Sequence, residues 1–271
     1  MATPLPQPHA HERLHESIAA TAEDIAALLR ADADPTTRVP GSEWSVGEAA
    51  AHLALANELM ADLAAGAERP YGDGSPGGLA AANAVSLAAF TERTPAVLAD
   101  AIVAHARAFV AAAAERSPAT QVQTPLGAMD LATLGSYLLT HMLGHGWDLA
   151  RALRRRHMCD RERVELCMPF LTTAMPRVVD PVAVGRLTAV YTLGLRGGGP
   201  RWTAAFDSGV LTVSPGAAAR PDCTIVTEPV TFLLIALGRC SPWGAIARGR
   251  IYAWGRRPRL APAFPRLFRA P

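Results

Sequence analysis

The sequence predicts a two-domain protein of the α + α/β class, with a four-helix bundle over residues 1–157 and an α+β domain with a linker helix over residues 158–271. Two observations carry this prediction. Apolar residues recur at helical spacing through roughly the first 155 residues. Runs rich in valine, threonine, isoleucine and aromatic residues, separated by glycine and proline, appear only after Asp180-Pro181. With 271 residues, half of them hydrophobic, the chain is long enough for two ordinary domains.

The helices of the first half are predicted to follow one another with short connections. The segment HERLHESIAATAEDIAALLRA ends at the breaker DADPTT. Ser45 and Glu48 form a capping box that begins the next helix, and Gly66 closes it. Further helices are expected at about 79–92 and 95–116, then an extended or turn-like segment, SPATQVQTPLGAM. Asp130 caps a last helix, which contains LLTHMLGHGWDLARAL, and the four long helices make an antiparallel bundle.

The second half begins with a helix predicted at about 161–178. The β signals that follow are GRLTAVYTLGLRG, RWTAAFDSGVLTVSP and DCTIVTEP. Three later segments are predicted to be helical, namely PVTFLLIALG, SPWGAIARG and PRLAPAFPRLF. Strands and helices that are grouped in this way are typical of an α+β domain.

The charge of the chain is unevenly distributed. Net charge is +2, but residues 229–271 carry eight arginines and no acidic residue, and lysine is absent from the whole chain. Arginine suits bidentate contacts with carboxylates and phosphates. A plain solvated basic face, an anionic membrane surface and an anionic small substrate all stay open as interpretations. Nucleic acid is not expected, because no recognised binding motif is present.

The N-terminus has no basic region followed by an apolar one, so no secretory signal is predicted. No uninterrupted apolar run reaches the ~18 residues that span a bilayer. The four cysteines form no CxxC pair, which favours free thiols in a reducing compartment. We therefore expect a cytoplasmic protein without a membrane span.

Histidines in the helical half predict a metal site. His141 and His145 are four residues apart, which places both imidazoles on one helix face, and Asp148 lies one turn further along the same stripe. His52 lies within another long apolar helix, GEAAAHLALANELM. Three imidazoles from two facing helices can chelate a divalent metal in a bundle core and leave a position for water or substrate. Asp148 is then an orienting partner or an acid/base.

Other aromatic and imidazole side chains are interpreted as structural. His105 suits a surface position or a plain core contact, whereas solvated positions are expected for His9, His11, His15 and His157. His9 and His11 are also expected to lie in a flexible terminus. Trp44, next to the capping serine, and Trp147 are expected to pack in the core.

The motifs EWSVGEAAAHLA and GSYLLTHMLGHGWDLARAL resemble the DinB-like metal-binding bundle of the mycothiol-dependent maleylpyruvate isomerase family. RWTAAFDSGVLTVSPG, PDCTIVTEPVTFLLIALGR and WGRRPRLAPAFPRLF resemble the sterol-carrier-like domain that is often fused to it. The resemblance covers nearly the whole chain. It implies that His52, His141 and His145 are metal ligands.

This sequence departs from the family at His141, where the isomerases usually have a glutamate. Three neutral ligands leave the site at +2 rather than +1, which makes the metal a stronger Lewis acid. Zinc is the favoured ion, with iron or nickel as alternatives. The departure weakens the prediction of maleylpyruvate isomerisation itself, because all-histidine triads also occur among thiol transferases of the wider DinB-like superfamily.

The resemblance implies thiol chemistry with mycothiol as cofactor. A metal-bound thiolate would add to, or displace a group from, a small electrophile, which gives isomerisation or S-transfer. Asp148 is the predicted proton shuttle, and Arg239 and Arg248 are the predicted carboxylate-binding residues. Two alternatives stay open: a three-histidine metalloenzyme that needs no thiol, and a non-catalytic protein that binds a lipid or another small ligand. The substrate and the oligomeric state are not predicted.

Overall fold

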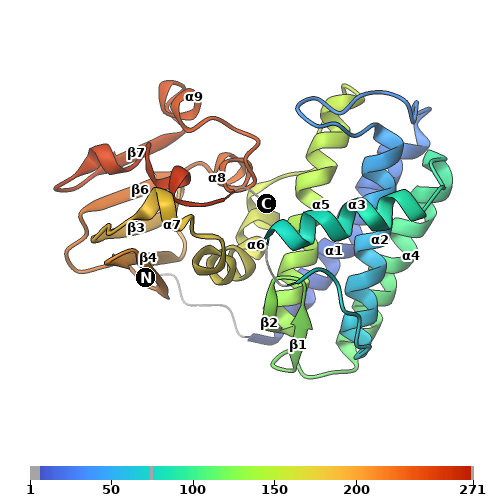
Figure 1. The fold of residues 1–271 in the computed structure, drawn as a ribbon, viewed down its shortest axis with the longest axis horizontal. Helices are drawn as coiled ribbons and strands as arrows, with labels where there is room; N and C mark the ends of the chain where they lie inside the picture. The colour runs from blue at the N-terminus through green and yellow to red at the C-terminus, as the bar shows by residue number, and fades with distance from the viewer. Residues whose placement is uncertain (1–6, 74–75, 270–271) are drawn as a thin grey trace. The chain divides into compact units, whose positions relative to one another are not determined.

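The computed structural model describes residues 7–73 and 76–269 (Figure 1). The chain divides into two compact units, and the division falls between Cys159 and Asp160. The first unit is mainly helical, and the second contains a five-stranded sheet. The two-domain mixture of a helical bundle and an α+β domain is therefore confirmed.

The helical unit is built around a four-helix bundle. In the bundle, α1 (Gln7–Arg30) packs on α4 (Pro95–Ala114) and α5 (Leu131–Ala152), and α2 (Val46–Ala65) packs on the same two helices. The shorter α3 (Pro76–Ala89) lies against α2. The core between the four long helices holds fully buried side chains, among them Ile18, Ile25, Leu53, Phe109, Leu138 and Leu139. Apolar stripes on several amphipathic helices thus bury one another, as the periodicity predicts.

The predicted helix ends of the bundle are found in the structure. The Ser45 hydroxyl accepts a hydrogen bond from the Glu48 backbone N–H, and the Glu48 carboxylate accepts one from the Ser45 N–H, so both halves of the capping box are present. Gly66 ends α2 with φ of 96°, a left-handed conformation that glycine adopts without steric cost. Asp130 caps α5 by accepting from the Thr133 N–H at 2.7 Å.

The extended segment before α5 is a β-hairpin, with β1 (Gln121–Thr124) antiparallel to β2 (Gly127–Asp130). The helix α4 is long and apolar enough, by length and composition only, to cross a membrane. Asp100 and Arg107 interrupt its apolar sequence, and it packs against α1 and α2 in the bundle. Core helices of soluble proteins meet the same criterion.

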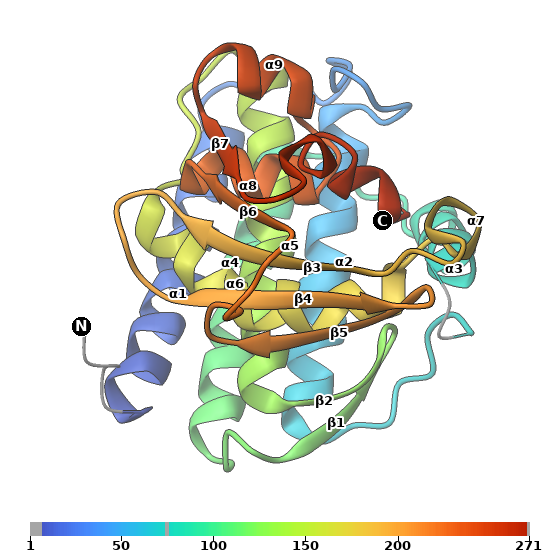
Figure 2. The same cartoon turned by 90° about the vertical axis from the view of Figure 1, so that its left-hand side faces the viewer.

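The second unit begins with α6 (Arg161–Ala174), the 3₁₀ helix η1 (Met175–Val178) and the short α7 (Pro181–Val184). Its sheet has the strand order β5-β4-β3-β6-β7, and Figure 2 shows these strands side by side. The strands are β3 (Ala189–Leu195), β4 (Arg201–Asp207), β5 (Val210–Pro215), β6 (Cys223–Thr227) and β7 (Ile251–Trp254). β3 and β6 are parallel, and the other neighbouring pairs are antiparallel.

One core of the second unit lies on a single face of the sheet. Alternate residues of the strands, such as Tyr191 and Leu193 on β3 and Ile225 on β6, pack with Phe264 and Leu267 near the C-terminus. The helices α8 (Pro229–Ala236) and α9 (Pro242–Ala247) precede β7. Along the predicted strands, residues that face this core thus alternate with residues that face away from it.

Three details of the second unit differ from the sequence prediction. The helix expected at 161–178 is α-helical only to Ala174 and continues as η1. The segment PRLAPAFPRLF, expected to be helical, forms the 3₁₀ turns η2 (Pro258–Leu260) and η3 (Phe264–Leu267), because its prolines lack the N–H that a continuous α-helix needs. Strand β7 was not predicted; its four residues pair along one edge with β6 and are mostly exposed, so they carry little apolar alternation.

Candidate metal centre

Three imidazoles from two helices meet inside the helical unit. His52 comes from α2, and His141 and His145 come from α5. One ligand atom from each residue can be chosen so that all three lie within 4.8 Å of one another, and the Nε2 atoms of His52 and His141 are 3.0 Å apart. The ring centroids are 4.6–5.0 Å apart. The structure therefore brings together the three residues that the sequence singles out.

The geometry fits a transition-metal ion. Tetrahedral zinc with Zn–N bonds of about 2.0–2.1 Å holds its nitrogen ligands about 3.3 Å from one another. The His52–His141 nitrogen distance is already near this value, and the longest separation has to shrink by only about 1.5 Å, which imidazole rotation can supply. Three neutral nitrogen ligands are a donor set that zinc, iron, nickel and copper accept.

Burial keeps His52 neutral. Its side chain is 5% exposed, and loss of hydration lowers its pKa to about 4. A neutral imidazole keeps a lone pair for a metal ion at neutral pH, whereas a protonated one would repel the ion. The buried position of His52 inside the bundle therefore suits binding of a metal ion.

Asp148 lies beside the imidazole of His145. Its Oδ2 is 3.7 Å from His145 Nδ1, and both side chains are mostly buried. This distance is longer than a direct hydrogen bond but short enough for an electrostatic interaction. The predicted proximity of Asp148 to the histidine pair is therefore present in the fold, and its catalytic role stays a prediction.

Trp44 has a position that sequence reasoning missed. Its ring centroid is 4.8 Å from that of His52 and 5.9 Å from that of His145, so the indole forms part of the wall around the imidazoles.

Tyr137 lies on another side of the imidazoles, with its ring centroid 6.4 Å from that of His141, and burial raises the pKa of its phenol. Tyr137 precedes His141 by one helical turn, a spacing that signals this neighbour in the sequence. No comparable local signal exists for Trp44.

The other histidines of the bundle fall into two groups. His105 follows the expectation, because its Nδ1 lies 3.0 Å from the Ala54 carbonyl oxygen. The solvated positions predicted for His157, His15 and His11 are wrong; His11 is partly buried on α1. His157 is partly buried with its ring centroid 4.4 Å from that of Trp147, and His15 is partly buried on α1. The side chain of His9 lies outside the described residues.

The predicted arginines belong to the second unit. Arg239 is partly buried and donates from Nη1 to the Leu237 carbonyl at 2.6 Å, and Arg248 is exposed after α9. Their roles in binding a substrate stay predictions. The cysteines are free thiols, as expected, with three buried and Cys240 partly exposed.

Comparison with protein families tests the resemblance. The profile of the mycothiol maleylpyruvate isomerase N-terminal domain matches residues 14–150, which is half of the chain and includes all three histidines. The chain belongs to this family. The profile of the SCP-2 sterol transfer family matches residues 177–255, within the second unit. The resemblance predicted from the sequence is thus confirmed for both halves.

One solved structure supports the fold, and a second is reported beside it. The structure of a histidine-to-alanine mutant of the mycothiol-dependent maleylpyruvate isomerase has a TM-score of 0.50 at 16% identity, with 89% of this chain and 93% of that chain covered. The unmutated isomerase gives 0.48 at 17% identity, with 89% and 94% covered.

A sec-alkylsulfatase from Pseudomonas sp. gives a TM-score of 0.34 at 16% identity over 52% of this chain. The chain spans only a quarter of the length of the sec-alkylsulfatase structures that it matches. No curated protein sequence matches the chain.

Proposed function

We propose that this protein is a metal-dependent, mycothiol-using enzyme that isomerises, or transfers a thiol to, a small electrophile. The observation that carries the proposal is the convergence of His52, His141 and His145 in a chain of the mycothiol maleylpyruvate isomerase family. Zinc is the ion we favour, because three nitrogen ligands with one open position are typical of catalytic zinc. A divalent ion held there supplies Lewis acidity that lowers the pKa of a bound thiol.

The protein's own side chains hold and orient this centre. His145 turns Nδ1 toward Asp148, so we assign its Nε2 as the ligand atom. The carboxylate then fixes the imidazole orientation and favours a proton on Nδ1. Trp44 covers one side of the imidazoles with an apolar ring, which limits water and strengthens electrostatic interactions inside the site. Arg239 and Arg248 are our candidates for binding a carboxylate of the substrate or the thiol.

The test is turnover of maleylpyruvate by purified protein, with and without mycothiol, before and after chelation. We expect isomerisation that needs both the thiol and the metal, and that is lost in His145→Ala. His105→Ala removes another imidazole of the bundle and is the matched control, with activity retained. Isomerisation that persists without metal would overturn the metal role, and isomerisation independent of mycothiol would overturn the thiol role.

Thiol transfer is the second candidate, and His141 is the specific observation that favours it. The all-histidine ligand set leaves a bound ion with one more positive charge than the set containing glutamate that the family resemblance leads us to expect. We expect His141→Glu to move the half-maximal pH of the thiol-dependent rate upward, because a less positive centre favours the thiolate less. An unchanged pH profile would contradict a role for His141 in setting thiol acidity. Conjugation of mycothiol to an aryl halide, without maleylpyruvate turnover, would select transfer over isomerisation.

A further inference from the structure

A second histidine pair lies on α1, away from the three ligands assigned above. His11 and His15 are four residues apart, the same spacing as His141 and His145. Residues at this spacing share one face of an α-helix, with their side-chain roots about 6 Å apart. The sequence alone places His11 in a flexible terminus, but the structure places both residues in the described part of α1.

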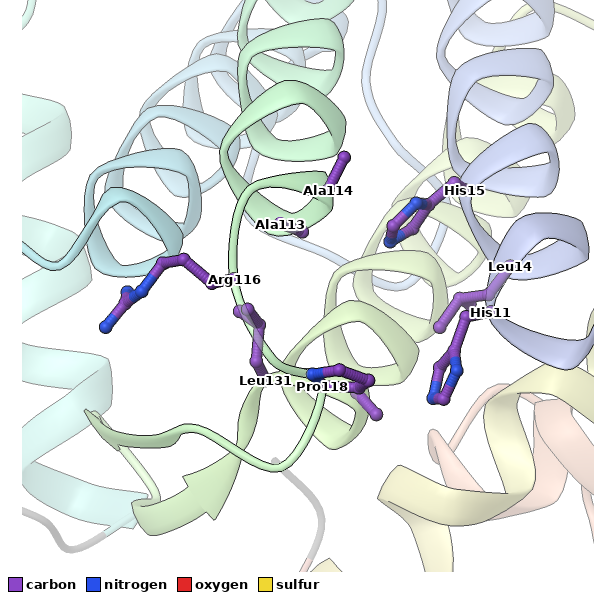
Figure 3. Close-up of a pocket in the computed structure, with 9 residues that line it drawn as sticks. His11, Leu14, His15, Ala113, Ala114, Arg116, Pro118 and Leu131 are labelled. Carbon is purple, nitrogen blue, oxygen red and sulfur yellow. The ribbon is translucent and has the colours of Figure 1, made fainter. Parts of the chain in front are cut away.

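Both imidazoles line the same pocket of about 170 Å³. Figure 3 shows them projecting from α1 toward the end of α4 and the segment that leads to α5. The remaining wall is largely apolar and small, formed by Leu14, Ala113, Ala114, Pro118, Leu131 and Ala132. Both histidines are only partly exposed, so the helix surface presents two imidazoles at the edge of a cavity rather than in open solvent.

The one charged side chain of the described pocket lining is held elsewhere. Figure 3 shows Arg116 pointing away from the histidines, and its Nη1 donates to the carbonyl of Ala64 at 2.7 Å. Among the described lining residues there is also no carboxylate. The described lining therefore offers no carboxylate oxygens, which calcium and magnesium prefer as ligands. The side-chain atoms that can bind a cation here are the imidazole nitrogens of His11 and His15.

The surroundings of His15 favour its neutral imidazole. Burial, followed by the nearby His11, lowers the pKa of His15, so its lone pair is available at neutral pH. Borderline transition-metal ions such as Zn²⁺, Ni²⁺ and Cu²⁺ prefer these ligands. Two imidazoles fill two coordination positions, and water or a small ligand in the pocket fills the rest.

We propose that His11 and His15 form a second transition-metal site, which binds Zn²⁺ through two imidazoles more weakly than the three-histidine site. The difference in strength follows from ligand number, since no third histidine, cysteine or carboxylate of the described residues joins this pair in a metal-binding cluster. The open coordination positions would face an apolar wall, which suits a ligand with a donor atom on a small apolar body.

The test is calorimetric titration of metal-stripped full-length protein with Zn²⁺. We expect two binding events in the wild type, loss of the weaker event in His11→Ala/His15→Ala, and retention of both in the control His105→Ala. If the three-histidine site binds no Zn²⁺ but the His11–His15 site does, the wild type shows a single binding event. That event then disappears in His11→Ala/His15→Ala, which separates failure of the first site from failure of the second. A double variant that keeps the wild-type stoichiometry overturns the proposal.

A second measurement guards against loss of folding in the double variant. Single His11→Gln and His15→Gln variants keep a polar side chain of similar size, and circular dichroism checks the helix content. We expect each single variant to lose the weaker event, because a lone imidazole no longer chelates. Full retention of both events in a folded single variant would mean that the weaker site lies elsewhere in the chain.

Discussion

Replacement of His52 by alanine is the most direct perturbation of the candidate metal centre. His52 is the one candidate ligand of the three that comes from α2, so its removal leaves two imidazoles on a single helix. Its Nε2 is 3.0 Å from His141 Nε2, which means that the helices already hold these nitrogens near ligand spacing. A preformed site of this kind spends little free energy on rearrangement, and we expect the variant to lose stoichiometric metal.

The magnitude can be worked out for thermal unfolding of the wild type. A metal ion at 100 times its dissociation constant stabilises the folded state by about 2.7 kcal/mol. For a unit of about 150–250 residues, 1 kcal/mol corresponds to about 2–4 °C in Tm. Metal should therefore raise the Tm of the helical unit by roughly 5–11 °C in the wild type, and by close to zero in His52→Ala.

The assay compares Tm with and without Zn²⁺, with elemental analysis of the same samples. We would carry it out in the His11→Ala/His15→Ala background, so that the second proposed site adds no shift. The metal-free samples show how much stability His52→Ala loses through packing alone. A wild-type-sized metal shift in His52→Ala, with one ion still bound, would refute the assignment of His52 as a ligand.

Two further predictions concern the scaffold. Asp130→Ala should destabilise the helical unit by about 1 kcal/mol in urea unfolding, because the Thr133 N–H loses its cap; no change would mean that the cap is redundant. Phe109→Ala should cost about 3–5 kcal/mol, since a fully buried ring leaves a cavity, whereas a cost below 1 kcal/mol would contradict its core position.

In metal-free protein, the stability of the helical unit should fall as pH drops from about 6.5 to 4, by roughly 3 kcal/mol from His52 alone. The unfolded chain takes up a proton there, and the folded chain, with a His52 pKa of about 4, does not. An equal decline in His52→Gln would assign the loss to other groups.

The sequence by itself determined the features that depend on neighbours within a few residues. The capping box of Ser45 and Glu48, the Gly66 end of α2 and the Asp130 cap are satisfied by backbone groups in the same turn. The pairing of His141 and His145 on one face follows from helical geometry alone. The family motifs of both halves lie in continuous segments, so they also could be recognised without a fold.

Only the tertiary structure decided which distant residues meet. His52 and His141 are 89 positions apart, and their 3.0 Å approach depends on the packing of α2 against α5. The contact of Trp44, just before α2, with His145 on α5 has the same origin. The contact of His157 with Trp147 instead needs the segment after α5 to fold back along that helix. The His11–His15 pocket likewise needs the ends of α4 and the start of α5 beside α1. Local spacing in the sequence fixes the helix face on which a side chain lies. The residues that this face contacts depend on which other helix or strand packs against it. A single sequence segment does not specify that distant helix or strand.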